Sequence, residues 1–150
     1  MKQELLTKHF TLNELTHSSL ALRRGLYNQP DVEAASNLTR LARHILEPVR
    51  AHFARPFRPS SGFRSLAVNR LLGSKDSSQH ITGQAVDFEL AGIPNRLLAD
   101  WIKDNLVFDQ LILEFYRPEE PASGWVHCSY RAGDNRQQSL IFDGTTYREF

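Results

Sequence analysis

Residues 78–88 read Ser78-Gln79-His80-Ile81-Thr82-Gly83-Gln84-Ala85-Val86-Asp87-Phe88. A polar loop leads here through a glycine turn into an alternating segment, in which Val86 and Phe88 would share one face of a strand and Asp87 the other. An unpaired carboxylate in so apolar a strand is costly, and a bound cation removes that cost. Gly83 permits the tight turn that lets His80 and Asp87 point at one ion. The segment therefore predicts a strand and two metal ligands.

A second alternating segment supplies a third ligand. It reads Gly124-Trp125-Val126-His127-Cys128-Ser129-Tyr130. Val126 and Cys128 are expected to face the core, so that His127 faces the site. Two imidazoles and one carboxylate suit one Zn²⁺ with its fourth position open, as in catalytic zinc sites. His80, Asp87 and His127 are thus the candidate zinc ligands, and the single cysteine excludes an intrachain disulfide and thiolate zinc sites of the Cys₄ or Cys₂His₂ kind.

The rest of the chain predicts helices first and strands later. Pro30 and Asp31 announce a long helix, whose apolar stripe has steps of three and four residues and consists of Leu38, Leu41, Ile45, Val49 and Phe53. Pro48 interrupts this stripe and is expected to kink or divide the helix. Further helices are expected from Thr11 and over 65–72 and 94–105, and strands over 84–90, 109–116, 125–130, 139–142 and 146–150. This order predicts a small α+β domain, with N-terminal helices packed on a mostly antiparallel sheet.

Length and composition narrow the class of protein. The 150 residues suit one domain, 1–150, and no run of about 18 apolar residues predicts a membrane span. The net charge is +1, and the arginines are spread out, which favours solvated helix surfaces over a nucleic-acid-binding surface; examples are Arg40, Arg43, Arg50, Arg55 and Arg58. Residues 1–8 lack the apolar stretch of a secretion signal, so synthesis in the cytoplasm without a signal peptide is expected.

A zinc-bound water needs a base, and a carboxylate is the usual one. If strands 109–116 and 125–130 pair with Tyr116 opposite Trp125, Glu114 faces His127, with Cβ atoms roughly 4.5–5.5 Å apart. A shift of one residue would turn Glu114 away from the site. The weaker competing carboxylates are Glu89, Glu119 and Glu120.

Arg64 ends an extended piece after Gly62 and Phe63. From such a position its guanidinium could hold a substrate carboxylate or a developing oxyanion. The alternative is an ordinary surface arginine.

Several separate motifs, in the same order, resemble the M15 peptidase family. These are zinc D-alanyl-D-alanine carboxypeptidases and phage-type murein endopeptidases, whose fold is shared with the hedgehog signalling domain. The similarity is greatest to the small phage-like branch and covers about residues 9–130, leaving a hairpin at 131–150. The most specific motifs are Ser61-Gly62-Phe63-Arg64-Ser65, Ser78-Gln79-His80 with Gly83, Ala85 and Asp87, and Asp109-Gln110-Leu111-Ile112-Leu113-Glu114-Phe115.

The resemblance implies a zinc-dependent peptidase that hydrolyses peptidoglycan, as a D-Ala-D-Ala carboxypeptidase or a murein endopeptidase, by metal-activated water. It implies zinc ligation by His80, Asp87 and His127. It also implies that Arg64 stabilises the scissile carbonyl or its tetrahedral intermediate, and that Ser78 helps to hold the substrate.

Two positions near the last ligand complete the expected site. Trp125 is a second candidate for substrate contact. Many relatives place the catalytic glutamate three residues before the last histidine, where this chain has Gly124. In the phage-like branch a glutamate of the preceding strand takes its place, which again indicates Glu114.

The expected partner is the stem peptide of peptidoglycan. The protein is expected to be a monomer that acts at the cell wall, and neither a nucleic acid nor a membrane is an expected partner. The delivery route stays open, with a phage or prophage context as the family expectation. A non-catalytic, zinc-stabilised module that binds peptidoglycan or a protein is the main alternative, although a structural metal needs neither Glu114 nor Arg64. An iron oxygenase with two histidines and a carboxylate is disfavoured, because six residues separate His80 from Asp87.

Overall fold

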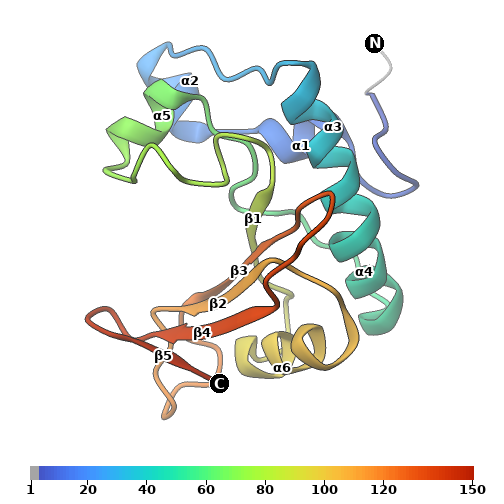
Figure 1. The fold of residues 1–150 in the computed structure, drawn as a ribbon, viewed down its shortest axis with the longest axis vertical. Helices are drawn as coiled ribbons and strands as arrows, with labels where there is room; N and C mark the ends of the chain where they lie inside the picture. Colours follow the sequence, from blue (N-terminus) through green and yellow to red (C-terminus); the bar gives the residue numbers. More distant parts are fainter. Residues whose placement is uncertain (1–3) are drawn as a thin grey trace.

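The computed structural model describes residues 4–150, which form one five-stranded sheet in the order β1-β3-β2-β4-β5 (Figure 1). The strands are β1 (Ala85–Phe88), β2 (Gln110–Glu114), β3 (Trp125–Ser129), β4 (Gln138–Phe142) and β5 (Tyr147–Glu149). All neighbours are antiparallel except β2 and β4, which run parallel. The predicted α+β class is therefore confirmed, and β4 and β5 form an antiparallel hairpin at the end of the chain.

Several of the helices begin at a Ser, Thr or Asp side chain that caps their first turn. They are α1 (Leu12–Thr16), α2 (Ser19–Arg24), α3 (Val32–Leu41), η1 (Ala42–Leu46), α4 (Glu47–Phe53), α5 (Leu66–Leu71) and α6 (Asn95–Asn105). Thr11 and Glu14 form a capping box at α1, and the Asp31 carboxylate accepts a hydrogen bond from the Ala34 N–H at 2.8 Å at the start of α3.

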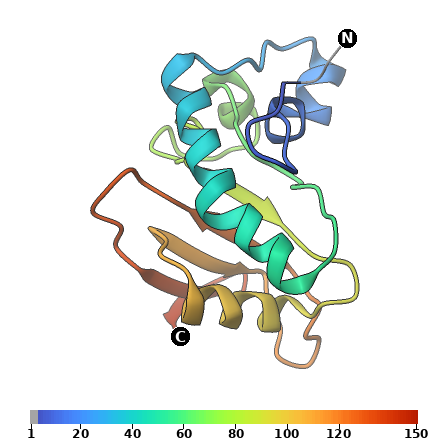
Figure 2. The same cartoon turned by 90° about the vertical axis from the view of Figure 1, so that its right-hand side faces the viewer.

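The long predicted helix is present as α3, η1 and α4, which continue one another (Figure 2). Pro48 has no N–H to donate to the carbonyl four residues earlier, and the π-helical turn η1 ends two residues before it. The helix is therefore not divided at Pro48; its α-helical pattern changes only over η1, and Leu38, Leu41, Ile45 and Val49 of the predicted stripe are all buried.

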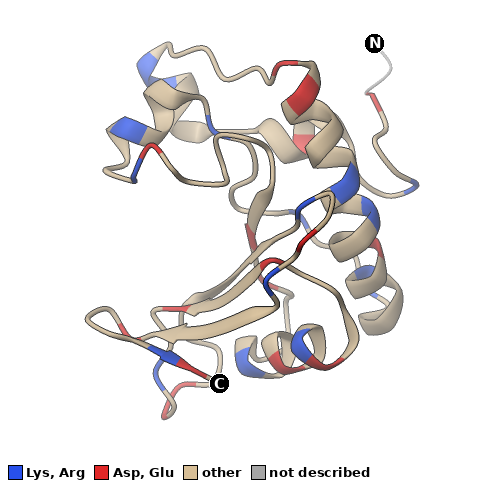
Figure 3. Ribbon diagram, in the orientation of Figure 1, with Lys and Arg blue, Asp and Glu red and all other residues tan. Residues whose placement is uncertain are grey.

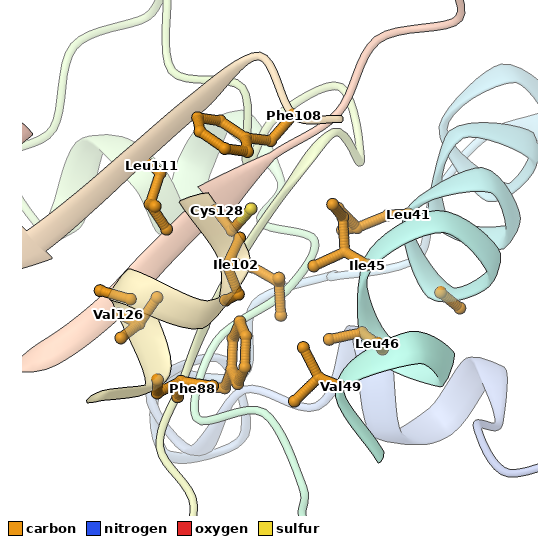
Figure 4. Packing of buried hydrophobic residues seen from close by; sticks show 14 of the residues in the cluster. Leu41, Ile45, Leu46, Val49, Phe88, Ile102, Phe108, Leu111, Val126 and Cys128 are labelled. Carbon is orange, nitrogen blue, oxygen red and sulfur yellow. The ribbon is translucent and has the colours of Figure 1, made fainter. Parts of the chain in front are cut away.

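One face of the sheet carries the core. Leu41, Ile45, Leu46 and Val49 of the long helix point toward side chains from β1, β2, β3 and α6, all of them buried (Figure 4). On β3 the core residues are Val126 and Cys128, both fully buried, as the alternation predicted. Because the helices cover this face, the intervening residues of the same strands point to the other face of the sheet.

Basic and acidic residues are interspersed along the helices and loops (Figure 3). No helix within residues 4–150 combines the length and the apolar character that a membrane crossing requires. The first three residues, part of the segment 1–8 on which the expectation about a signal peptide rests, lie outside the described range.

Candidate metal centre

The three predicted ligands meet on the sheet face opposite the core. Asp87 of β1 lies directly across the ladder from His127 of β3, and His80 comes from the loop before β1. One ligand atom from each residue lies within 4.8 Å of the others. The structure thus brings together residues 80, 87 and 127, and the described chain contains no second cluster of this kind.

Their donor atoms converge on the Asp87 carboxylate. His127 Nδ1 lies 3.0 Å from Asp87 Oδ1, and His80 Nε2 lies 3.4 Å from Asp87 Oδ2. Zinc with N and O ligands at about 2.0–2.2 Å places neighbouring ligand atoms about 3.4 Å apart. The donor set and its spacing therefore fit a zinc ion.

The orientation of His80 is fixed by backbone groups. Its Nδ1 lies 2.7 Å from the carbonyl oxygen of Gly62, and since a carbonyl only accepts, Nδ1 carries the proton. Nε2 then keeps its lone pair for a metal, the usual arrangement of a metal-binding histidine. Gly83 adopts φ +73° in the turn after His80, as the sequence predicted.

Arg64 is not a surface arginine, because its side chain is only 14% exposed. Its guanidinium lies 3.3 Å from Asp87 Oδ2 and also bonds to Ser61 Oγ and Asn69 Oδ1. Burial alone would raise the pKa of Asp87, but the neighbouring imidazoles of His127 and His80 hold that pKa below its usual range. Asp87 is therefore an ionised, buried carboxylate beside a buried cation.

The expected pairing of Glu114 with His127 is wrong by two residues. Glu114 lies opposite Trp125, and Ile112 lies opposite His127. The strand ends earlier than expected, because Phe115 turns to φ +52° and the Tyr116 N–H bonds to the Phe142 carbonyl instead. A shift of two residues preserves the face, so Glu114 still points to the side of the ligands.

Glu114 lies diagonally across from His127, a relation in which long side chains still reach one another. Burial raises the pKa of Glu114; the charge of His127 opposes this and that of Asp87 adds to it. A raised pKa suits a group that accepts and returns a proton near neutral pH.

The ligands open into a cleft of about 1000 Å³. Glu114, Arg64, Ser78 and Trp125 all line it, and Glu114 is the only glutamate that does so among residues 4–150. Ser78 Oγ also accepts a hydrogen bond from the His80 N–H at 3.2 Å. The competing carboxylates of residues 89, 119 and 120 lie outside the cleft lining.

Sequence reasoning missed the support of the loop that carries His80. Asp109, fully buried just before β2, accepts hydrogen bonds from Gln79 Nε2 at 2.9 Å and from Arg136 Nε and Nη2 at 3.0 and 2.8 Å. Burial opposes ionisation of Asp109, but the contacts with Arg136 and Gln79 hold its pKa at about 2. No local sequence pattern predicts these hydrogen bonds, because Gln79, Asp109 and Arg136 lie 27 to 57 residues apart in the chain.

Sequence reasoning also missed an aromatic surface in the same cleft. Phe115, Phe142 and Tyr147 line it together with Trp125. The alternation of Phe142 and Tyr147 with their strand neighbours was the available signal.

A family model described as Peptidase M15 matches residues 8–129 of the chain. The matched range contains His80, Asp87, Glu114 and His127. No curated protein matched the chain.

Proposed function

Because the chain belongs to the M15 peptidase family, we propose that it is a zinc-dependent peptidase that hydrolyses stem peptides of bacterial peptidoglycan, as a carboxypeptidase or an endopeptidase. The observation that supports this most is the convergence of His80, Asp87 and His127 at the wall of an open cleft. A carboxylate of raised pKa, Glu114, lies on the same face.

His80, Asp87 and His127 would hold the zinc, which supplies Lewis-acid polarisation of the scissile carbonyl and lowers the pKa of a water to about 7. Glu114 accepts the proton of the attacking water and returns it to the leaving amine. Hydrolysis then needs no covalent intermediate.

Arg64 acts beside Asp87. Its guanidinium holds the ligand carboxylate in place through the 3.3 Å contact. Because it also lines the cleft, it is placed to hold the oxyanion of the intermediate. Ser78 and Trp125, which both line the cleft, are the proposed substrate contacts.

The test is mass spectrometry of fragments released from purified peptidoglycan by the zinc-loaded protein, with a chelated sample alongside. Chelator-sensitive release is expected, and the new termini identify the bond that is cut. Stoichiometric zinc without any release, from intact or partly digested peptidoglycan, would overturn the hydrolase and favour a zinc-stabilised binding module.

A further inference from the structure

The cleft has two chemically different sides. Its cationic side chains are Arg64 from the segment before α5, Lys75 from the loop before β1 and Arg136 from the segment before β4. The other side is formed by the ends of β2 to β5, where Glu114 lies opposite Phe142 and Phe142 opposite Tyr147. This side carries no cation among the described residues that line the cleft.

Four rings form a continuous row there, here called the aromatic row: Trp125, Phe115, Phe142 and Tyr147. Successive ring centroids are 5.2, 5.1 and 4.4 Å apart. Phe115 is 47% exposed and Tyr147 57% exposed, although both are large aromatic residues. The row crosses about three strand spacings, or ~14 Å, and begins two residues from the ligand His127.

The backbone beneath the row is strained. Phe115 adopts φ +52°, which is a genuine outlier for a bulky residue. Gly124 packs so closely that a Cβ there would lie 1.7 Å from the Glu114 carbonyl oxygen, so the corner has no room to relax. Strain of this kind persists where surrounding structure enforces it, typically at functional sites. Here it holds the Phe115 ring between Trp125 and Phe142.

We propose that the aromatic row binds a sugar ring of the glycan strand to which the stem peptide is attached. The proposal rests on the proposed function and specifies its substrate. The faces of aromatic rings carry partial negative charge and attract the C–H groups of a sugar ring. The lack of a cation on this side of the cleft, with Glu114 beside the row, disfavours an anionic ligand there. The ~14 Å length of the row suits a substituent several bonds removed from the scissile peptide.

The experiment compares two substrates that share one stem peptide, with and without its disaccharide, on the zinc-loaded protein. Tyr147→Ala is expected to lower kcat/KM about tenfold on the disaccharide-linked peptide, the typical cost of truncating an aromatic contact, and to leave the free peptide unchanged. Phe115→Asn, which suits the left-handed backbone, is expected to show the same selective loss. Tyr27→Ala removes a 75% exposed tyrosine outside the cleft and is the matched control.

Binding of the free disaccharide, followed by NMR titration, gives a second readout that needs no turnover. Wild-type binding that weakens in Tyr147→Ala but not in Tyr27→Ala supports the row. If Tyr147→Ala lowers kcat/KM equally on both peptides, or on neither, the aromatic row does not bind the sugar. The proposed peptidase function is unaffected by that result. If the wild type cleaves neither peptide, the proposed function fails, and the disaccharide titration still decides the row.

Discussion

The Nδ1–H of His80 donates a hydrogen bond to the carbonyl oxygen of Gly62, 2.7 Å away in the protein interior. Gly62 itself is pressed against α1, and its neighbour Phe63 donates its N–H to the Leu15 carbonyl at 2.8 Å. The orientation of a metal ligand therefore depends on how closely two backbone segments approach each other.

Gly62→Ala tests this dependence. The added Cβ would lie 2.3 Å from the Leu15 carbonyl oxygen, so the segment must move and take the Gly62 carbonyl with it. We expect zinc affinity to fall by about 10–100-fold, as for loss of other groups that orient metal ligands, measured by competition with a chromophoric chelator. Wild-type zinc affinity in a folded Gly62→Ala protein would show that this contact does not control His80.

Glu114→Gln is expected to retain zinc and to lose turnover by about 10²–10⁴-fold, because the amide cannot accept the proton of the attacking water. Mass spectrometry of the metal content checks that zinc is retained, and peptide-release rates check that turnover is lost. Glu89→Gln is the matched control, since Glu89 bonds to Asn95 outside the cleft. Activity surviving in Glu114→Gln, or lost in Glu89→Gln, would assign the base elsewhere.

Removal of zinc by a chelator is expected to leave the protein folded at 25 °C. The ligands lie on the sheet face opposite the core, and Asp87 keeps Arg64 and both histidines as partners. Loss of an ion present at 100 times its Kd costs about 2.7 kcal/mol, or a drop in Tm of about 5–10 °C. Far-UV circular dichroism and thermal melts check this, and a chelated chain without secondary structure would contradict it.

Asp109→Asn is expected to reveal an acid-dependent part of the stability. The folded pKa of Asp109, about 2, lies below its ordinary value of 3.8, so its ionised form stabilises the fold fully above pH 3.8. This contribution, ~2 kcal/mol, disappears as the pH falls from 3.8 through about 2. Urea unfolding of both proteins should thus differ at pH 6 and converge near pH 2. If the difference in unfolding free energy between the two proteins did not depend on pH, the charge of Asp109 would not be the source of its contribution to stability.

Local patterns in the sequence determined much of this protein. The steps of three and four residues predicted the long helix, and the alternation around Asp87 and His127 predicted two strands and which face carries the ligands. Both succeed because they depend only on the geometry of a single helix or strand. The three candidate ligands could be predicted for the same reason, since each lies within its own short motif.

The tertiary structure alone decided how these pieces meet. The register of β2 against β3 differed from expectation because it depends on Gly124 fitting against Glu114 and on the backbone turn at Phe115, which are non-local contacts. The parallel pairing of β2 with β4, the bonds of Asp109 to Gln79 and Arg136, and the aromatic row likewise join residues far apart in the chain. Periodicity within one element carries no information about such partners, so the sequence supplies the ligands while the folded sheet supplies the cleft around them.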